Sequence, residues 1–167
     1  AYTPEQNIAH AMTALMAQNK GAGKIDRMKE GFRCGIILET IYGILIFIIC
    51  FALARPLMMM FVKDEEVIGH GVTYLHLISV MYLLPALTNG IHGFFRGIGD
   101  LKITLISSFI NMALRVLAAA PLVLIWKMGI EALPYSYLAG WIGMLVAETP
   151  LLLKTYKTWG KKGETPC

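Results

Sequence analysis

The chain has 167 residues, 56% apolar and 16% charged, against roughly 45–50% and 25% in soluble domains. A chain of this length cannot bury so much apolar surface in a water-soluble core, which indicates a membrane protein. The formal net charge of +4 does not indicate nucleic-acid binding, because the charges lie in short segments between apolar runs, as membrane topology requires.

The apolar runs predict one all-α membrane domain over residues 1–167, a helical bundle of four complete transmembrane helices and one truncated helix. The first apolar patch, within residues 5–18, is shorter than the about 20 residues that cross a bilayer. We expect it to be the remnant of a longer helix, and the chain to be part of a larger protein. Complete spans are predicted at about residues 35–54, 72–95, 103–126 and 130–153.

Lysine and arginine gather in three segments that share one side of the membrane if each span crosses once. They are residues 20–33, residues 96–102 and the tail 154–167, which together carry eleven Lys and Arg against three on the opposite side. The positive-inside rule places such segments in the cytoplasm. We therefore expect a multi-pass protein of the plasma membrane whose C-terminus is cytoplasmic.

Each predicted span has one face of polar or small residues. Such residues face protein or a watery cavity rather than lipid, so these faces either line a solute pathway or form close helix–helix contacts. Close contact is the favoured interpretation for the glycines and serines. The residues predicted to line a substrate pathway are Tyr82, Asn89, His92, Asn111, Arg115, Glu148 and Glu39.

Arg115 lies near the middle of its predicted span, where an arginine costs about 2.5–3.5 kcal/mol on insertion scales. It needs water or a carboxylate partner, and Glu39 and Glu148 are the carboxylates available within the spans. We expect a polar cluster with Arg115 as its deepest member. Pro85 is predicted to kink or loosen the second span, because proline removes a backbone hydrogen bond.

Neither a Ser/His/Asp constellation nor a Cys/His spacing typical of metal sites appears in the sequence. The three cysteines are widely spaced and indicate no disulfide framework. The sequence therefore predicts no enzyme, no catalytic residue, no metal site and no cofactor.

Two glycine-containing loops carry a resemblance to a known family. Residues 17–24 read Ala-Gln-Asn-Lys-Gly-Ala-Gly-Lys, and residues 96–100 read Arg-Gly-Ile-Gly-Asp. They resemble the loops after the second and fourth helices of a repeat in multidrug and toxic compound extrusion (MATE) transporters. Arg115, Pro121, Gly129-Ile130 and Gly140-Trp141 are similar to the last two helices of that repeat. The loop residues in question are Gly21, Gly23, Arg96, Gly97, Gly99 and Asp100.

The chemistry of these loops favours tight helix connections over a ligand site. Glycine permits a sharp change of direction after a helix, and Asp100 is placed to cap the next helix.

The resemblance implies part of the C-terminal six-helix lobe of an antiporter, whose partners would be the lipid bilayer and the N-terminal lobe of the same chain. It implies export of small organic cations or drugs by alternating access, driven by inward flow of H⁺ or Na⁺. No coupling carboxylate is assigned, because the span 72–95 contains no Asp or Glu. We expect this fragment not to transport by itself.

Two alternatives remain open. The first is a lipid-linked saccharide flippase of the same superfamily, which would show more cationic residues facing the cleft. The second is a membrane scaffold subunit without transport activity, which the polar face on every span disfavours.

Overall fold

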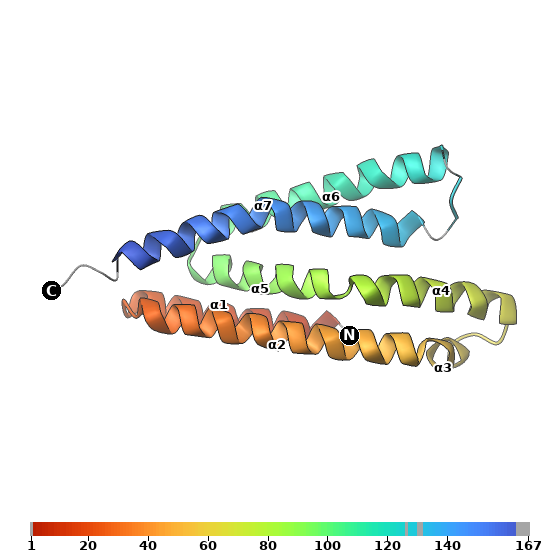
Figure 1. The fold of residues 1–167 in the computed structure, drawn as a ribbon, viewed down its shortest axis with the longest axis horizontal. Helices are drawn as coiled ribbons and strands as arrows, with labels where there is room; N and C mark the ends of the chain where they lie inside the picture. Colours follow the sequence, from red (N-terminus) through yellow and green to blue (C-terminus); the bar gives the residue numbers. More distant parts are fainter. Residues whose placement is uncertain (1, 126, 130–131, 163–167) are drawn as a thin grey trace.

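A computed structural model describes residues 2–125, 127–129 and 132–162. The described residues form seven α-helices and no strand (Figure 1). The helices are α1 (Tyr2–Gly21), α2 (Ile25–Ala52), α3 (Ala54–Met59), α4 (Glu65–Met81), α5 (Leu83–Gly97), α6 (Leu101–Leu124) and α7 (Ala132–Lys162).

The helices lie side by side along the long axis in two groups. Helices α1, α2 and α5 pack against one another. Helix α4, which precedes α5 in the chain and leads into it, packs on α2 and α3. Helices α6 and α7 form an antiparallel hairpin that contacts the first group mainly through α5 (Figure 1). Helix α5 is therefore the element on which the two groups meet.

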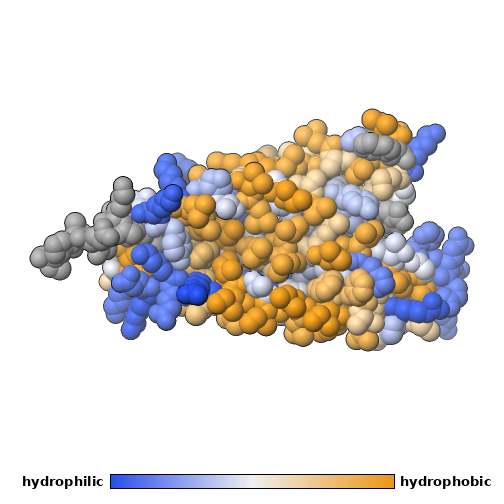
Figure 2. Space-filling model, in the orientation of Figure 1, coloured by the Kyte–Doolittle hydropathy of each residue, from blue (hydrophilic) through white to orange (hydrophobic). Residues whose placement is uncertain are grey.

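The bundle has the length and polarity pattern of a membrane protein. Helices α2, α6 and α7 are each long and apolar enough to cross a bilayer, and the α4–α5 pair qualifies as one bent span. On the face that Figure 2 shows, apolar residues cover the middle of the bundle and hydrophilic residues gather at both ends. The prediction of an all-α membrane bundle is confirmed.

The three Lys- and Arg-rich segments predicted to share a side lie at one end of the bundle. This end holds the α1–α2 connection, the α5–α6 connection and the last turns of α7 (Figure 1). A direct contact joins two of them, because Lys20 Nζ donates to the carbonyl oxygen of Ile98.

Helix boundaries extend beyond the predicted spans. Helix α2 begins at Ile25, ten residues before the predicted start at residue 35, and α7 continues to Lys162 through most of the predicted tail. Hydropathy marks only the part of a helix that lies in lipid, whereas charged residues such as Arg27 and Lys154 extend the same helices. The predicted span limits at residues 126 and 130, and residues 163–167, lie outside the described residues.

The predicted short helix within residues 5–18 is part of the longer α1. Helix α1 is 20 residues long but is too polar to rank among the candidate spans. Its buried face is Glu5, Ala9, Met12 and Met16, whose spacing of three and four residues is that of one helical stripe.

The second predicted span is broken at Tyr82 into α4 and α5, which meet at a bend of 42°. Pro85 lies in the first turn of α5. It has no N–H to donate to the carbonyl of Met81, and its ring crowds that carbonyl. The Tyr82 N–H instead donates to the carbonyl of Ser79, 3.1 Å away. The kink predicted from Pro85 is present.

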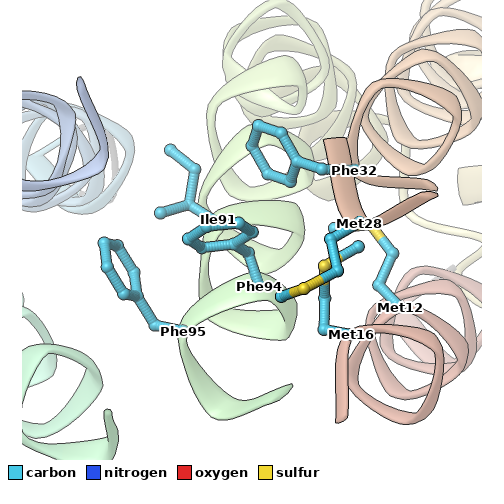
Figure 3. Close-up of a cluster of buried hydrophobic side chains, with 7 residues drawn as sticks. All are labelled: Met12, Met16, Met28, Phe32, Ile91, Phe94 and Phe95. Carbon is cyan, nitrogen blue, oxygen red and sulfur yellow. The ribbon is translucent and has the colours of Figure 1, made fainter. Parts of the chain in front are cut away.

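The apolar core joins α1, α2 and α5 at the positively charged end of the bundle. It consists of Met12, Met16, Met28, Phe32, Ile91, Phe94 and Phe95 (Figure 3). The Phe32 and Phe94 rings are tilted against each other, with centroids 4.9 Å apart.

Glycines let α5 approach α1 closely. A Cβ at Gly93 would lie 2.6 Å from the carbonyl oxygen of Ala9, and one at Gly97 would lie 2.3 Å from Met16 Cβ. Small residues one turn apart allow membrane helices to pack at this distance. Thr13 Oγ1 adds a bond, 3.1 Å from the Gly93 carbonyl oxygen. With this face of α5 fixed on α1, another face is presented to α6 and α7.

Candidate functional site

Two cavities lie where α4 and α5 face the α6–α7 hairpin, and Arg115 and Trp141 line both. We call the first, of about 260 Å³, the polar cavity; Thr88, Asn89, His92, Ser108, Asn111, Arg115, Trp141 and Met144 line it. We call the second, of about 370 Å³, the aromatic cavity; its lining is Tyr74, Ile78, Tyr82, Pro85, Arg115, Tyr137 and Trp141.

Helical spacing explains why these side chains converge. Asn89 and His92 are three residues apart on α5, and Ser108, Asn111 and Arg115 are three and four residues apart on α6. Such residues share one face of a helix. Five of the seven residues predicted to line a pathway are brought together here: Tyr82, Asn89, His92, Asn111 and Arg115.

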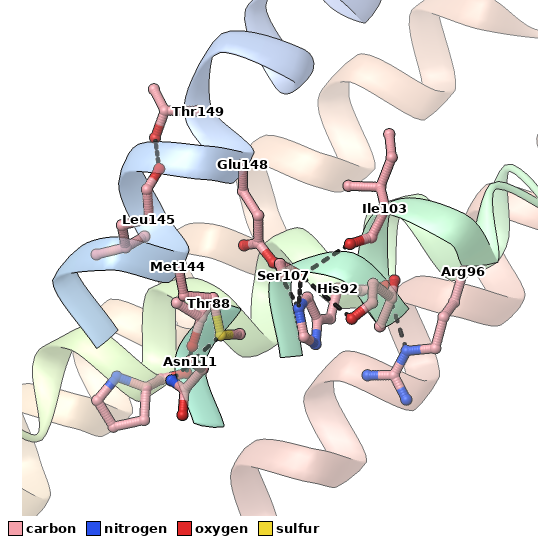
Figure 4. Close-up of polar contacts among 12 residues, drawn as sticks. Thr88, His92, Arg96, Ile103, Ser107, Asn111, Met144, Leu145, Glu148 and Thr149 are labelled. Atoms are coloured by element: carbon pink, nitrogen blue, oxygen red, sulfur yellow. Dashed lines mark hydrogen bonds and ion pairs between the residues drawn. The ribbon is translucent and has the colours of Figure 1, made fainter. Parts of the chain in front are cut away.

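A buried polar link ties α5 to α6 and α7 beside the polar cavity (Figure 4). His92 Nε2 lies 2.5 Å from Glu148 Oε1 and 3.1 Å from Ser107 Oγ. The Ser107 hydroxyl is also 2.9 Å from the carbonyl oxygen of Ile103. Glu148 is fully buried, and its Oε2 has no hydrogen-bond partner among the described residues. The carboxylate is therefore held behind the cavity wall rather than in the lining.

Arg115 is held by aromatic rings. Its guanidinium carbon lies 4.2 Å from the centroid of Tyr137 and 5.4 Å from that of Trp141, and these two rings stack on each other. The side chain passes over Gly140, where a Cβ would lie 2.8 Å from Arg115 Cγ. A cation over the faces of such rings is stabilised by their quadrupoles.

Arg115 is paired with neither of the carboxylates available within the spans, Glu39 and Glu148. Among the described residues no carboxylate lies within ion-pair distance of the Arg115 guanidinium. The packing of α6 on α7 sets Trp141 beside Arg115, and Glu148 is seven residues further along α7, about 10 Å at 1.5 Å per residue. At that level the basic side chain available to Glu148 is His92.

Two other buried carboxylates lie outside the cavities. Glu39 on α2 faces α5, with its Cγ 3.7 Å from a Cβ built at Gly90. Neither of its oxygens has a hydrogen-bond partner among the described residues. Glu5 on α1 is fully buried as well, and Asn89 Nδ2 donates to its Oε2 over 3.4 Å. Asn89 thus lies between Glu5 and the polar cavity.

Glu5 was missed by sequence reasoning, which considered carboxylates only within the four complete spans. The signal that finds it is its position four, seven and eleven residues before Ala9, Met12 and Met16, on the apolar stripe of α1. A carboxylate on such a stripe is buried when the stripe packs.

The two glycine loops have the same backbone geometry. In one, the N–H groups of Ala22, Gly23 and Lys24 donate to residues four, three and five positions earlier. The N–H groups of Ile98, Gly99 and Asp100 repeat these three bonds. Gly23 and Gly99 occupy corresponding positions with φ of 68° and 81°, the left-handed conformation that ends many helices.

The remaining loop residues have structural contacts. Gly21 is the last residue of α1 and has open space around it. Gly97 packs on α1 as described above, and Arg96 Nε donates to the His92 carbonyl oxygen over 3.2 Å. Asp100 occupies the N-cap position of α6, but its side chain makes no capping hydrogen bond. The predicted capping role is wrong, because φ and ψ of −96° and 70° depart from the extended backbone usual at that position.

Among the described residues, no group of three or more His, Cys, Asp and Glu side chains is placed to hold a metal ion. The polar groups in the cavities are amides, hydroxyls, one histidine, one guanidinium and the Trp141 indole, with a thioether and apolar side chains beside them. This arrangement can bind and orient a small molecule through hydrogen bonds, charge and ring stacking.

Several helices long and apolar enough to cross a bilayer, with a polar and an aromatic cavity between them, define a multi-pass α-helical membrane protein. The MatE family matches residues 1–120, so the chain belongs to this family, in agreement with its resemblance to MATE transporters. It is 25% identical over 146 residues to a probable multidrug resistance protein NorM of Thermotoga maritima, an alignment that covers 87% of this chain. The chain spans 30% of the length of that relative. No solved structure gives a significant match.

Proposed function

We propose that this chain is part of the C-terminal lobe of a MATE-type antiporter in the plasma membrane, which exports small drugs or organic cations. The observation that carries the proposal is the pair of cavities between α5 and the α6–α7 hairpin. Polar side chains within membrane helices are costly, and in transporters they mark the route of the solute. The relative named as a multidrug resistance protein supports the same activity.

The proposed mechanism is alternating access by rocking of this lobe against an N-terminal lobe of the same protein. The α6–α7 hairpin joins the rest of the bundle mainly through α5, and the α4–α5 bend at Tyr82 lies at the aromatic cavity. Broken helices often lie at transport sites, because the ends of the half-helices and the backbone groups freed at the break can bind substrate or ions. The Lys- and Arg-rich end and the C-terminus would face the cytoplasm.

Coupling to H⁺ or Na⁺ needs groups within the membrane that bind and release this cation. The fully buried carboxylates Glu5, Glu39 and Glu148 have this chemistry, since a buried carboxylate is stable only when it is protonated or paired with a cation. Glu148 is paired with His92. We propose that Glu5, Glu39 and Glu148 are the candidate ion-coupling residues.

The experiment measures drug accumulation in a bacterial strain that lacks its own drug exporters. The strain expresses the full-length protein encoded by the gene. A series of fluorescent drugs covers cationic, zwitterionic and acidic molecules. We expect cells that express the protein to accumulate less of at least one class of drug than cells that carry the empty vector. An ionophore that collapses the H⁺ or Na⁺ gradient should abolish this difference. Unchanged accumulation of every class would support the scaffold alternative, and export of a lipid-linked saccharide instead would support a flippase.

A further inference from the structure

The positive charge of Arg115 has no counter-ion in the part of the chain that the structure describes. An arginine stays protonated in proteins. Neither cavity has an Asp or Glu among the described residues that line it. The Arg115 Nε atom is buried and has no hydrogen-bond partner among the described residues. The guanidinium carbon lies over the two rings, which stabilise its charge through their faces without accepting its N–H groups as an oxygen would.

Glu148 is the nearest carboxylate on α7, but it is engaged elsewhere. It is fully buried and bonded to His92. The charge of Arg115 therefore acts on the contents of the cavities rather than on a protein carboxylate.

The polar cavity offers further donors beside this charge. Asn111 Nδ2 points to Met144 Sδ at 3.4 Å, and a thioether is a weak acceptor. Asn89 adds an amide to the same lining, one N–H of which donates to Glu5. The Thr88 hydroxyl is no further donor, because it donates to the carbonyl oxygen of Pro85. Guanidinium and amide N–H groups together match the two oxygens of a carboxylate, and guanidinium–carboxylate bonds are among the strongest hydrogen bonds in proteins.

The aromatic cavity next to it suits a flat apolar group. Tyr74, Tyr82 and Ile78 line it together with the rings that hold Arg115. Ring stacking and apolar contact in such a cavity give affinity without a fixed hydrogen-bond pattern. Because Arg115 lines both cavities, one molecule can place its acidic group in the first and its ring in the second.

We propose that Arg115 is a substrate-binding residue that takes the carboxylate of an aromatic organic acid or zwitterion, whose ring lies in the aromatic cavity. The inference rests on the proposed function as an exporter, and it narrows the substrates to molecules that carry an acidic group. A simple organic cation would meet the guanidinium as a like charge.

The test uses three probes with one naphthalene ring: 2-naphthoate, 2-naphthamide and 2-naphthylmethyl-trimethylammonium. Each is titrated calorimetrically into the full-length protein in lipid nanodiscs. We expect the carboxylate to bind about tenfold or more tightly than the neutral amide, as one charge-assisted hydrogen bond implies, and the ammonium to bind weakest. Equal affinities, no binding of the carboxylate, or tightest binding of the ammonium would overturn the proposal.

Variants of Arg115 test whether this residue causes the preference for the carboxylate over the amide. Arg115→Gln should remove the preference for carboxylate over amide, and Arg115→Lys should keep part of it. Arg55→Gln is the matched control, because Arg55 is exposed and paired with Glu65 outside both cavities. If size-exclusion chromatography shows that Arg115→Gln does not fold, the Arg115→Lys series and the wild-type ranking decide. A full preference retained in Arg115→Gln would overturn the proposal.

The outcomes separate this inference from the proposed function. Tight binding of the ammonium together with cellular export of cationic drugs would overturn the role of Arg115 and leave the exporter intact. The expected ranking without any export in cells would support the binding site and contradict the exporter.

Discussion

His92 on α5 and Glu148 on α7 are joined by a contact of 2.5 Å between Nε2 and Oε1. Both side chains are buried, and the contact adds a polar bond to the packing between the α6–α7 hairpin and the α5 group. A hydrogen bond in such a buried place is electrostatically stronger than one at the surface.

The first prediction concerns this pair. Glu148→Gln keeps the shape of the side chain but replaces its carboxyl group with an amide, so the bond to His92 weakens. We expect a loss of about 1–3 kcal/mol in the free energy of unfolding, measured as a lower melting temperature of the full-length protein in detergent. His92→Gln and the double variant complete a cycle in which the two effects should not add. Glu66→Gln, on an exposed side chain at the start of α4, should have little effect.

The second prediction concerns the contact of α5 with α1. Gly93→Ala places a methyl group 2.6 Å from the Ala9 carbonyl oxygen. Because this oxygen belongs to the backbone of α1, relieving the clash requires a shift of the helix itself. We expect a loss of about 1–3 kcal/mol, the usual cost of overpacking.

The matched control for Gly93 is Gly69→Ala, since Gly69 lies in α4 with no atom within 4 Å of its built Cβ. There the change should raise stability by about 0.5–1 kcal/mol through helix propensity. Equal effects of both changes on the melting temperature would show that α1 and α5 are not in this close contact.

The third prediction concerns the two matching loops. Gly99→Ala and Gly23→Ala each put a side chain on a residue with positive φ, at a cost of about 1–2 kcal/mol. Gly21→Ala changes a glycine of the same loop that has open space and no positive φ, and it should be tolerated. Thermal unfolding of the three variants measures the difference; a loss at Gly21 as large as at Gly99 would contradict the proposed geometry.

The fourth prediction concerns the 42° bend between α4 and α5. Pro85→Ala restores an N–H that can donate to the Met81 carbonyl, so the two helices should straighten. Spin labels on Glu66 and Leu101, which are both exposed, report the change as a distance longer by a few ångström. The native cysteines are replaced first. An unchanged distance would mean that packing around Tyr82 rather than Pro85 sets the bend.

The sequence was sufficient to locate the spans and five of the thirteen residues that line the two cavities. Apolar runs mark spans directly, and the spacing of Asn89, His92, Asn111 and Arg115 places each on one face of its helix. The glycine loops indicated the family that the comparison with known proteins then showed.

The partner of Arg115 could not be predicted, because helical spacing does not fix the height of one helix against another. Moving α7 by two turns relative to α6 would exchange Trp141 for Glu148 beside Arg115. The observed register depends on Gly140 and Gly143, where built Cβ atoms would lie 2.8 Å from Arg115 Cγ and 2.0 Å from Leu114 Cδ1. Contacts of this kind follow from the packed structure and not from the periodicity of either helix.

The most direct test of a transport route between α5 and the α6–α7 hairpin is uptake by the reconstituted full-length protein in proteoliposomes under an imposed H⁺ or Na⁺ gradient. The cargo is a fluorescent zwitterionic drug with an aromatic carboxylate and an amine. We predict gradient-driven uptake that Arg115→Gln lowers about tenfold, the effect of losing about 1.4 kcal/mol of binding, and that Arg55→Gln leaves unchanged. Uptake that is independent of the gradient, or equal in wild type and Arg115→Gln, would contradict this route.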